Sequence, residues 1–158
     1  MLGDKIQHAD WKKEKHVPII DCPSLVKADE FFEVTVSLGK EIAHPNTTEH
    51  HIGWICLYFH PEGQQFTYDV ARFEFNAHGE SAKGPDKGPV YTHHQGSTAM
   101  KVDQPGTLYA LALCNIHGLW ESSQESKLLE TYAERSEPGV ALYNIHGLWE
   151  SSQESKLL

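Results

Sequence analysis

The sequence predicts an all-β protein, an antiparallel β-sandwich built from several short strands. Three observations favour this fold class: apolar residues alternate with polar ones at a period of two, turn residues separate the runs, and no long segment has the 3.6-residue period of a helix. A length of 158 residues suits one domain with a substantial core. We therefore expect one sandwich with a C-terminal extension.

The most regular predicted strand is residues 32–38, where apolar side chains at even positions alternate with polar ones. Residues 52–60 are apolar on both faces, which is typical of a central strand. Residues 66–76 change phase, with apolar positions first at 66, 68 and 70 and then at 71, 73 and 75, which predicts a bulge. Shorter predicted strands, separated by turn sequences such as GPDKGP and DQPG, are residues 89–92, 97–102 and 107–113.

An internal repeat marks the C-terminal part of the chain. Residues 112–129 and 141–158 match at 17 of 18 positions with a spacing of 29 residues. Two copies are too few for a solenoid, so we predict a domain at residues 1–129 and an extension at residues 130–158. Tyr143 replaces the cysteine of the first copy, and we expect the extension to hold no metal. The alternative is that the second copy competes with the first for the last strand position.

Charge and cysteine content restrict the partners and the compartment. The formal net charge is −9, from 13 basic and 22 acidic residues, which argues against binding to nucleic acid or to an anionic membrane. Three cysteines, Cys22, Cys56 and Cys114, form no disulfide framework and no CxxC motif. With no signal-peptide pattern and no membrane-spanning run, these features predict a cytoplasmic protein.

The 11 histidines include a candidate metal site. Potential ligands lie at the ends of predicted strands, where a sandwich gathers its loops: His16, His44, His50, Cys114 and His117. Four imidazoles and one thiolate are too many for a closed tetrahedral zinc site, and they suit iron with an open position for a small molecule. A thiolate ligand donates electron density to whatever binds at that position, so the set favours oxygen chemistry.

The remaining histidines are expected to be ordinary solvated or hydrogen-bonded residues: His8, His51, His60, His78, His93 and His94. His51 follows His50 directly and should point to the opposite face of the chain. Cys22 and Cys56 are expected to pack as small apolar residues. The backbone N–H groups of Asn115 and Ile116 are expected to hydrogen-bond the Cys114 sulfur.

Three segments together resemble the superoxide reductase family in its one-iron form, also called neelaredoxin, which is related to the iron-binding domain of desulfoferrodoxin. They are WKKEKHVP at 11–18, GKEIAHPNTTEHHI at 39–52 and CNIHGLW at 114–120. The resemblance covers about residues 8–125. It implies an immunoglobulin-like seven-stranded sandwich that carries one mononuclear non-haem iron per chain and reduces superoxide to hydrogen peroxide by one electron.

The resemblance also implies a role for each site residue. The equatorial ligands would be His16, His44, His50 and His117, and Cys114 would be the axial thiolate. Glu14 resembles the carboxylate that closes the sixth position in the oxidised state, and Lys15 resembles the lysine that attracts superoxide and helps to deliver a proton. The implied partners are a rubredoxin-like electron donor and three further copies in a homotetramer, and the implied role is detoxification under oxidative stress.

Other metal-binding sandwiches remain alternatives. A cupredoxin-like electron carrier without catalysis would need a weak axial ligand, usually Met, close to its Cys and His. The methionines are Met1 and Met100, and neither follows Cys114. A copper and zinc dismutase has no thiolate ligand, and a non-enzymatic metal-binding or assembly module would use the extension as its interaction element. The identity of the native metal discriminates among these proteins.

Overall fold

A computed structural model describes residues 1–128 of the chain and confirms the predicted β-sandwich. The predicted domain end at residue 129 and the extension at residues 130–158 lie outside the described residues. In chain order the elements are the 3-10 helix η1 (Leu2–Lys5) and the strands β1 (Ile19–Asp21), β2 (Leu25–Val26), β3 (Phe32–Ser37), β4 (Ile52–Pro61), β5 (Tyr68–Glu74), β6 (Gln95–Met100), β7 (Gly106–Cys114) and β8 (Gly118–Leu128).

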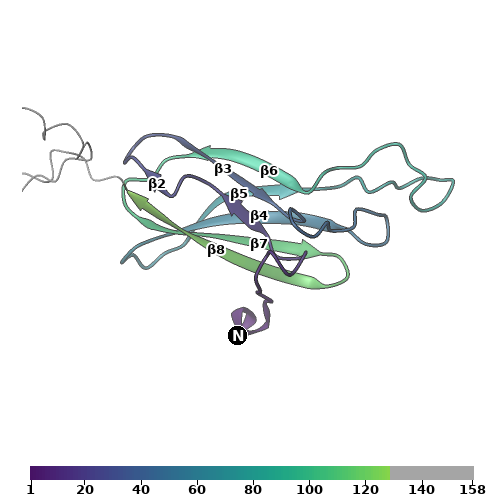
Figure 1. Ribbon diagram of the computed structural model, residues 1–158, viewed down its shortest axis with the longest axis horizontal. Helices are drawn as coiled ribbons and strands as arrows, with labels where there is room; N and C mark the ends of the chain where they lie inside the picture. Colours follow the sequence, from purple (N-terminus) through teal and green to yellow (C-terminus); the bar gives the residue numbers. More distant parts are fainter. Residues whose placement is uncertain (129–158) are drawn as a thin grey trace, which may run out of the picture.

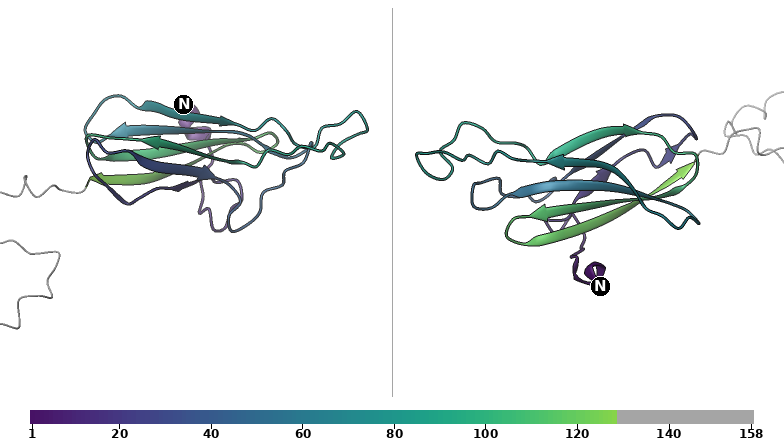
Figure 2. Two further views of the ribbon diagram at one scale, coloured as in Figure 1. Left: turned by 90° about the horizontal axis from the view of Figure 1, so that it is seen from above. Right: turned by 180° about the vertical axis from the view of Figure 1, so that it is seen from behind.

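The strands form two sheets that pack face to face (Figure 1). One sheet has the order β1-β3-β6 and the other β2-β8-β7-β4-β5, and two further views show the same layers (Figure 2). Seven antiparallel strands were expected, whereas the described part of the chain has eight, because β2 pairs in parallel with the end of β8. β1 and β2 are consecutive but belong to different sheets, so the chain switches sheets between them.

Two of the predicted strands and the predicted bulge are confirmed. β3 and β4 match the runs at 32–38 and 52–60, and the inward-facing Val34 and Val36 of β3 are fully buried. In the pairing of β4 with β5, Leu57 faces Ala71 and Tyr58 faces Asp69. One residue of β5 is therefore extra, which explains the change of phase after residue 70.

The remaining predictions of strands were less accurate. The run at 97–102 corresponds to β6, which begins and ends two residues earlier, and the run at 107–113 lies within β7, which is one residue longer at each end. The predicted strand at 89–92 is wrong: Tyr91 forms only an isolated bridge with His78, within a loop that projects beyond the sheets (Figure 1). β8 was missed because its sequence, GLWESSQESKL, is mostly polar and has no apolar alternation.

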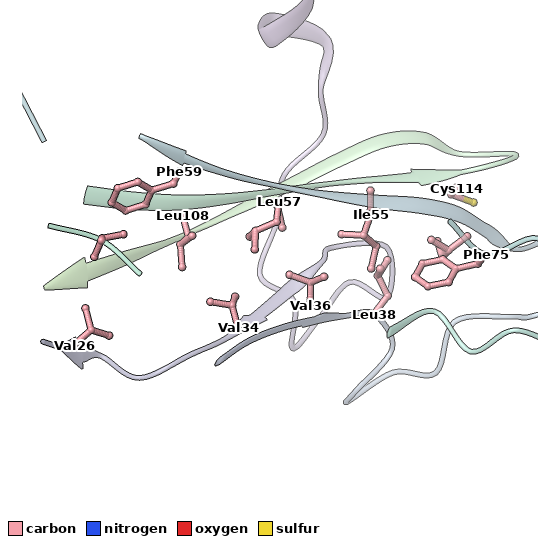
Figure 3. Close-up of a cluster of buried hydrophobic side chains, with 14 residues drawn as sticks. Val26, Val34, Val36, Leu38, Ile55, Leu57, Phe59, Phe75, Leu108 and Cys114 are labelled. Atoms are coloured by element: carbon pink, nitrogen blue, oxygen red, sulfur yellow. The ribbon is translucent and has the colours of Figure 1, made fainter. Parts of the chain in front are cut away.

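The core lies between the sheets, and Cys114 closes one end of it (Figure 3). Its central residues, Ile55, Leu57 and Leu108, have no exposed surface, and Cys114 is 1% exposed. The core therefore extends to the end of the sandwich where β7 meets the loops. No helix among the described residues is long and apolar enough to cross a membrane.

We expect Leu57→Ala to lower the free energy of unfolding by about 2–5 kcal/mol, because it leaves a cavity at a fully buried position. Leu25→Ala is the matched control, since Leu25 is 49% exposed and should lose less than about 1 kcal/mol. Urea unfolding followed by circular dichroism measures both values. Equal losses in the two variants would contradict the assignment of the core.

Candidate metal centre

Three segments far apart in the sequence meet at the end of the sandwich that Cys114 closes. His16 precedes β1, His44 and His50 enclose the loop that leads into β4, and Cys114 and His117 flank the turn between β7 and β8. All five predicted ligands are therefore on loops or strand ends, as expected for a site carried by a rigid sandwich.

Four of the five predicted ligands converge closely. One potential ligand atom from each of His16, His50, Cys114 and His117 lies within 4.8 Å of the others. His44 is not in this group, but its ring centroid is 4.9 Å from that of His16 and 4.7 Å from that of His50. The structure thus brings the four predicted imidazoles and the predicted thiolate into one cluster.

Backbone pairing and Asn115 hold the two principal loops together. Ile52 at the start of β4 pairs with Cys114 at the end of β7. Asn115 donates its backbone N–H to the His51 carbonyl at 3.1 Å and accepts the His51 N–H on Oδ1 at 2.9 Å. Its side-chain amide also donates to the Glu49 carbonyl at 2.8 Å. Three hydrogen bonds therefore fix the turn of Cys114 against the loop of His50.

The hydrogen bonds of His16 and His44 select the tautomer that leaves Nε2 free. Nδ1 of His16 lies 2.6 Å from the Glu14 carboxylate, and Nδ1 of His44 lies 2.6 Å from the Pro45 carbonyl. Because a carbonyl or carboxylate oxygen accepts a proton, each Nδ1 carries the hydrogen and each Nε2 keeps a lone pair. This arrangement of a bonded Nδ1 and a free Nε2 is typical of histidine ligands to metals.

Three buried ring nitrogens in the cluster have no hydrogen-bond partner, namely Nε2 of His16, His44 and His50. A buried polar atom without a partner costs about 1–3 kcal/mol, so such atoms are rare unless a ligand satisfies them. Their convergence beside a buried thiol therefore fits a metal ion, which would accept all three lone pairs.

Burial keeps these imidazoles neutral, as metal ligation requires. Burial lowers the pKa of His44 to about 4, against a smaller opposing effect of its hydrogen bond to Pro45. Burial also lowers the pKa of His16 and of His50, and for His16 it outweighs the nearby carboxylate of Glu14. The neutral imidazole is the form that binds a metal ion, so protons compete only weakly with a metal ion for these ring nitrogens.

The Cys114 sulfur receives one backbone hydrogen bond within the turn. The N–H of His117 lies 3.4 Å from Sγ, and Nδ1 of His117 lies 3.5 Å from it. The predicted bond from the Asn115 N–H is wrong, because this N–H binds the carbonyl of His51 instead. Of the two ring nitrogens of His117, Nδ1 is therefore the one that lies beside the sulfur.

Glu14 and Lys15 lie at the edge of the cluster. The Glu14 carboxylate accepts hydrogen bonds from the ring and the backbone of His16, which outweigh burial and lower its pKa. In this structure Glu14 is thus a partner of His16 and not one of the converging ligand atoms. The charge of Lys15 is one of the smaller contributions to the lowered pKa of both His16 and His50, after burial.

Several other residues behave as expected or add support that was not predicted. His51 points away from the cluster and stacks on His78 with ring centroids 3.6 Å apart. Cys56 is buried, and both it and Cys22 are free thiols. Trp120 was missed: its indole stacks on the His16 ring at 5.1 Å and donates a hydrogen bond to the His117 carbonyl. Only its position within CNIHGLW hinted at a role.

Comparisons with known proteins identify close relatives of this chain. A family profile described as Desulfoferrodoxin matches residues 8–123. Neelaredoxin of Megalodesulfovibrio gigas is 65% identical over 123 residues, which cover 78% of this chain and 95% of that protein. Superoxide reductase of Pyrococcus furiosus is 52% identical, over 77% of this chain and 96% of that protein. A solved structure of the superoxide reductase (neelaredoxin) from Archaeoglobus fulgidus in the reduced form superimposes with a TM-score of 0.72 at 52% identity, covering 78% of this chain and 98% of that one.

We expect Trp120→Leu to weaken binding of ferrous iron by about 10–100-fold, because the indole contacts both His16 and His117. Competition against a calibrated chelator measures the dissociation constant. Trp54→Leu is the matched control, since it removes an indole that lies beside Arg72 and outside the cluster. Similar losses in the two variants would show that Trp120 does not position the ligands.

Proposed function

The chain belongs to the desulfoferrodoxin family, and on this basis we propose that it is a superoxide reductase, which reduces superoxide to hydrogen peroxide by one electron. The observation that carries the proposal is the convergence of a buried thiol with imidazoles whose Nε2 atoms have no partner. The substrate is inferred from the names of the relatives. A group of imidazoles with one thiolate is a set of ligands that suits a redox metal.

We propose a single mononuclear non-haem iron as the metal. Its ligands would be His16, His44, His50, His117 and Cys114, and a metal held by these five residues could still bind a small molecule. Ferrous iron held by these residues would supply the electron for the reduction. A soft thiolate disfavours metals that prefer oxygen ligands. Four imidazoles and a thiolate are more ligands than the four that a closed tetrahedral zinc site uses.

The residues around the ligands keep the site ready to bind metal and substrate. Glu14 and the Pro45 carbonyl orient the rings of His16 and His44, and Trp120 packs on His16 from β8. These contacts hold the rings in fixed orientations, which lowers the reorganisation that binding of superoxide would require. Burial of the thiol, at 1% exposure, protects it from competing oxidants.

Lys15 supplies the local positive charge that an anionic substrate needs. The formal net charge of the chain is −9, so the protein as a whole repels superoxide. In residues 1–128 Lys15 has no salt-bridge partner within 4.0 Å, and its charge acts on His16 and His50. The product needs two protons together with the electron, and the ammonium group of Lys15 can relay a proton from solvent.

Glu14 is proposed as an additional ligand in the oxidised protein. Its Oε1 lies 2.6 Å from Nδ1 of His16, so binding a cation through this oxygen would require it to leave that nitrogen. Because its pKa is lowered, the carboxylate is anionic at neutral pH and can bind a cation without losing a proton. Exchange between these two positions would open and close the site.

We propose that the electron reaches the site from another protein. Cys22 and Cys56 are the only cysteines besides Cys114, which is too few for a four-cysteine cluster within this sequence. We propose a rubredoxin-like protein as the donor, a homotetramer as the oligomeric state and the cytoplasm as the location. All three rest on the family resemblance.

The structure favours this proposal over a cupredoxin-like carrier. That type of site uses two imidazoles, a thiolate and a weak axial ligand that is usually Met. Met1 is 99% exposed, and Met100 lines a cavity beside Phe59 and Val102 in the core, so neither lies in the cluster.

We expect the reduced, iron-loaded protein to form one hydrogen peroxide per superoxide consumed, without release of dioxygen. A calibrated superoxide flux, an oxygen electrode and a peroxidase-coupled assay measure the two products. Metal analysis of the purified protein should give close to one iron per chain. Dioxygen release in dismutation stoichiometry, or copper as the native metal, would contradict the proposal.

We expect Lys15→Ala to lower the second-order rate constant with superoxide by about 10-fold and to reduce its dependence on ionic strength, because the local cation is lost. Pulse radiolysis measures the rate constant. Lys101→Ala is the control, because this ammonium group lies over the Phe31 ring, away from the cluster. Equal rates for the two variants would exclude steering by Lys15.

A further inference from the structure

The loop between β5 and β6 contacts the segment that carries His44 and His50. Figure 1 and Figure 2 show this loop, residues 77–92, projecting beyond the sheets at one end of the sandwich. It belongs to neither sheet, so its hydrogen bonds to that segment are separate from the strand ladders. The sequence indicated only a turn here and assigned no role to His78.

Asp86, in this projecting loop, and Thr48 bind each other by two hydrogen bonds. The N–H of Thr48 donates to Oδ1 of Asp86 at 2.7 Å, and the N–H of Asp86 donates to Oγ1 of Thr48 at 3.1 Å. Asp86 has a φ of 58°, in the left-handed region that aspartate tolerates better than most residues. Tyr91 holds it there by donating its hydroxyl to the Asp86 carbonyl at 3.3 Å. The two loops are thus fixed to each other at one residue of each.

His78 makes a second set of contacts with the same segment, and it is 3% exposed. Its carbonyl accepts the Thr48 hydroxyl at 3.0 Å, and its Nδ1 lies 2.9 Å from Oδ1 of Asn46. Its ring stacks on His51 with centroids 3.6 Å apart, while its Nε2 lies 2.7 Å from the Phe75 carbonyl. His78 therefore connects three residues of the segment to the end of β5.

These contacts act on the turn of residues 47–50, which presents His50 to the cluster. The N–H of His50 donates to Oγ1 of Thr47 at 3.0 Å, and the His50 carbonyl accepts the Thr47 N–H at 3.0 Å. The turn is therefore closed on itself, and Asp86 binds it from outside at Thr48. Nε2 of His50 has no hydrogen-bond partner, so the direction of this ring depends on the backbone of the turn.

We propose that Asp86 and His78 are positioning residues for the metal centre, which set the place of His50 through the 47–50 turn. Neither residue is among the four whose ligand atoms converge, so each acts on the turn and not on the metal. The role of both residues rests on the proposed function, because the place of an imidazole matters to activity only if it binds the metal. Partners that orient metal ligands commonly contribute about 10–100-fold to metal affinity.

Asp86→Ala removes the carboxylate, and Asp29→Ala is the matched control. Asp29 has a φ of 61°, so alanine meets the same backbone penalty at both positions. Asp29 lines a cavity beside Phe59, at the end of the core opposite Cys114 (Figure 3). Asp86→Asn is the rescue variant, because its amide oxygen can still accept the N–H of Thr48.

We expect Asp86→Ala to raise the dissociation constant for ferrous iron by about 10-fold, and Asp29→Ala and Asp86→Asn to change it by less than about twofold. Competition against a calibrated chelator measures these constants. The absorption spectrum of the cobalt(II)-substituted protein, which responds to the number and arrangement of ligands, should change in Asp86→Ala and not in the other two. Equal losses in the two alanine variants, or an unchanged cobalt spectrum in Asp86→Ala, would overturn the role of Asp86.

His78→Phe keeps a ring against His51 and removes the contacts of both ring nitrogens. We expect this variant also to raise the dissociation constant for ferrous iron by about 10-fold. His60→Phe is the matched control, because His60 lies in β4 with its Nδ1 2.9 Å from Oγ1 of Thr67, outside the cluster. Equal constants for the two phenylalanine variants would overturn the role of His78.

Amide hydrogen exchange of the metal-free protein tests the positioning without any metal. Asp86→Ala should speed the exchange of the His50 amide, which Asp86 does not bind, by about 10-fold, and should leave the amides of β7 unchanged. Exchange at His50 as slow as in Asp29→Ala would overturn the proposal. If the unmodified chain failed to bind iron, the proposed function would be wrong, and the exchange rates would still decide whether Asp86 holds the turn.

Discussion

The pairing of β4 with β7 is the interaction on which the candidate metal centre depends. This ladder runs from Pro61 and Gly106 at one end to Ile52 and Cys114 at the other. It brings the thiol at the end of β7 beside the loop that carries His44 and His50, and Asn115 then bonds the two loops together. A change of register by one residue would turn Cys114 away from this end of the core and separate it from the imidazoles.

Electrostatics at the site follow from burial. Burial lowers the pKa of His16, His44 and His50, so these imidazoles remain neutral, and their Nε2 atoms have no hydrogen-bond partner in the protein. A protein with net charge −9 gains little from long-range attraction of an anion, so the attraction must come from charges next to the cluster. Glu14 and Lys15 are adjacent in sequence but differ in role: the Glu14 carboxylate accepts a hydrogen bond from the His16 ring, and we propose that the Lys15 ammonium group attracts the substrate.

The sequence was sufficient to predict the features that depend on local pattern. Alternation predicted β3, the change of phase predicted the bulge opposite Leu57, and strand-end placement selected the five residues that cluster. The sequence was insufficient for features that depend on contacts between residues far apart along the chain. β8 has no apolar alternation and is a strand because β7 pairs with it along its length, and Asn115 and Trp120 gain their roles from neighbours that lie far away in sequence. The hydrogen bond between the Glu14 carboxylate and the His16 ring likewise could not be predicted from the sequence, because it depends on the folded conformation of this loop.

The three segments that supply the cluster also belong to different parts of the sandwich. His16 leads into β1 of the three-stranded sheet, whereas Cys114 and His117 connect two strands of the five-stranded sheet. A single ion bound by these residues would tie the layers to each other and close a chain loop of about 100 residues, as a disulfide would. The metal ion would then stabilise the folded sandwich as well as serve as a redox group, so the stability of the fold would depend on the supply of iron.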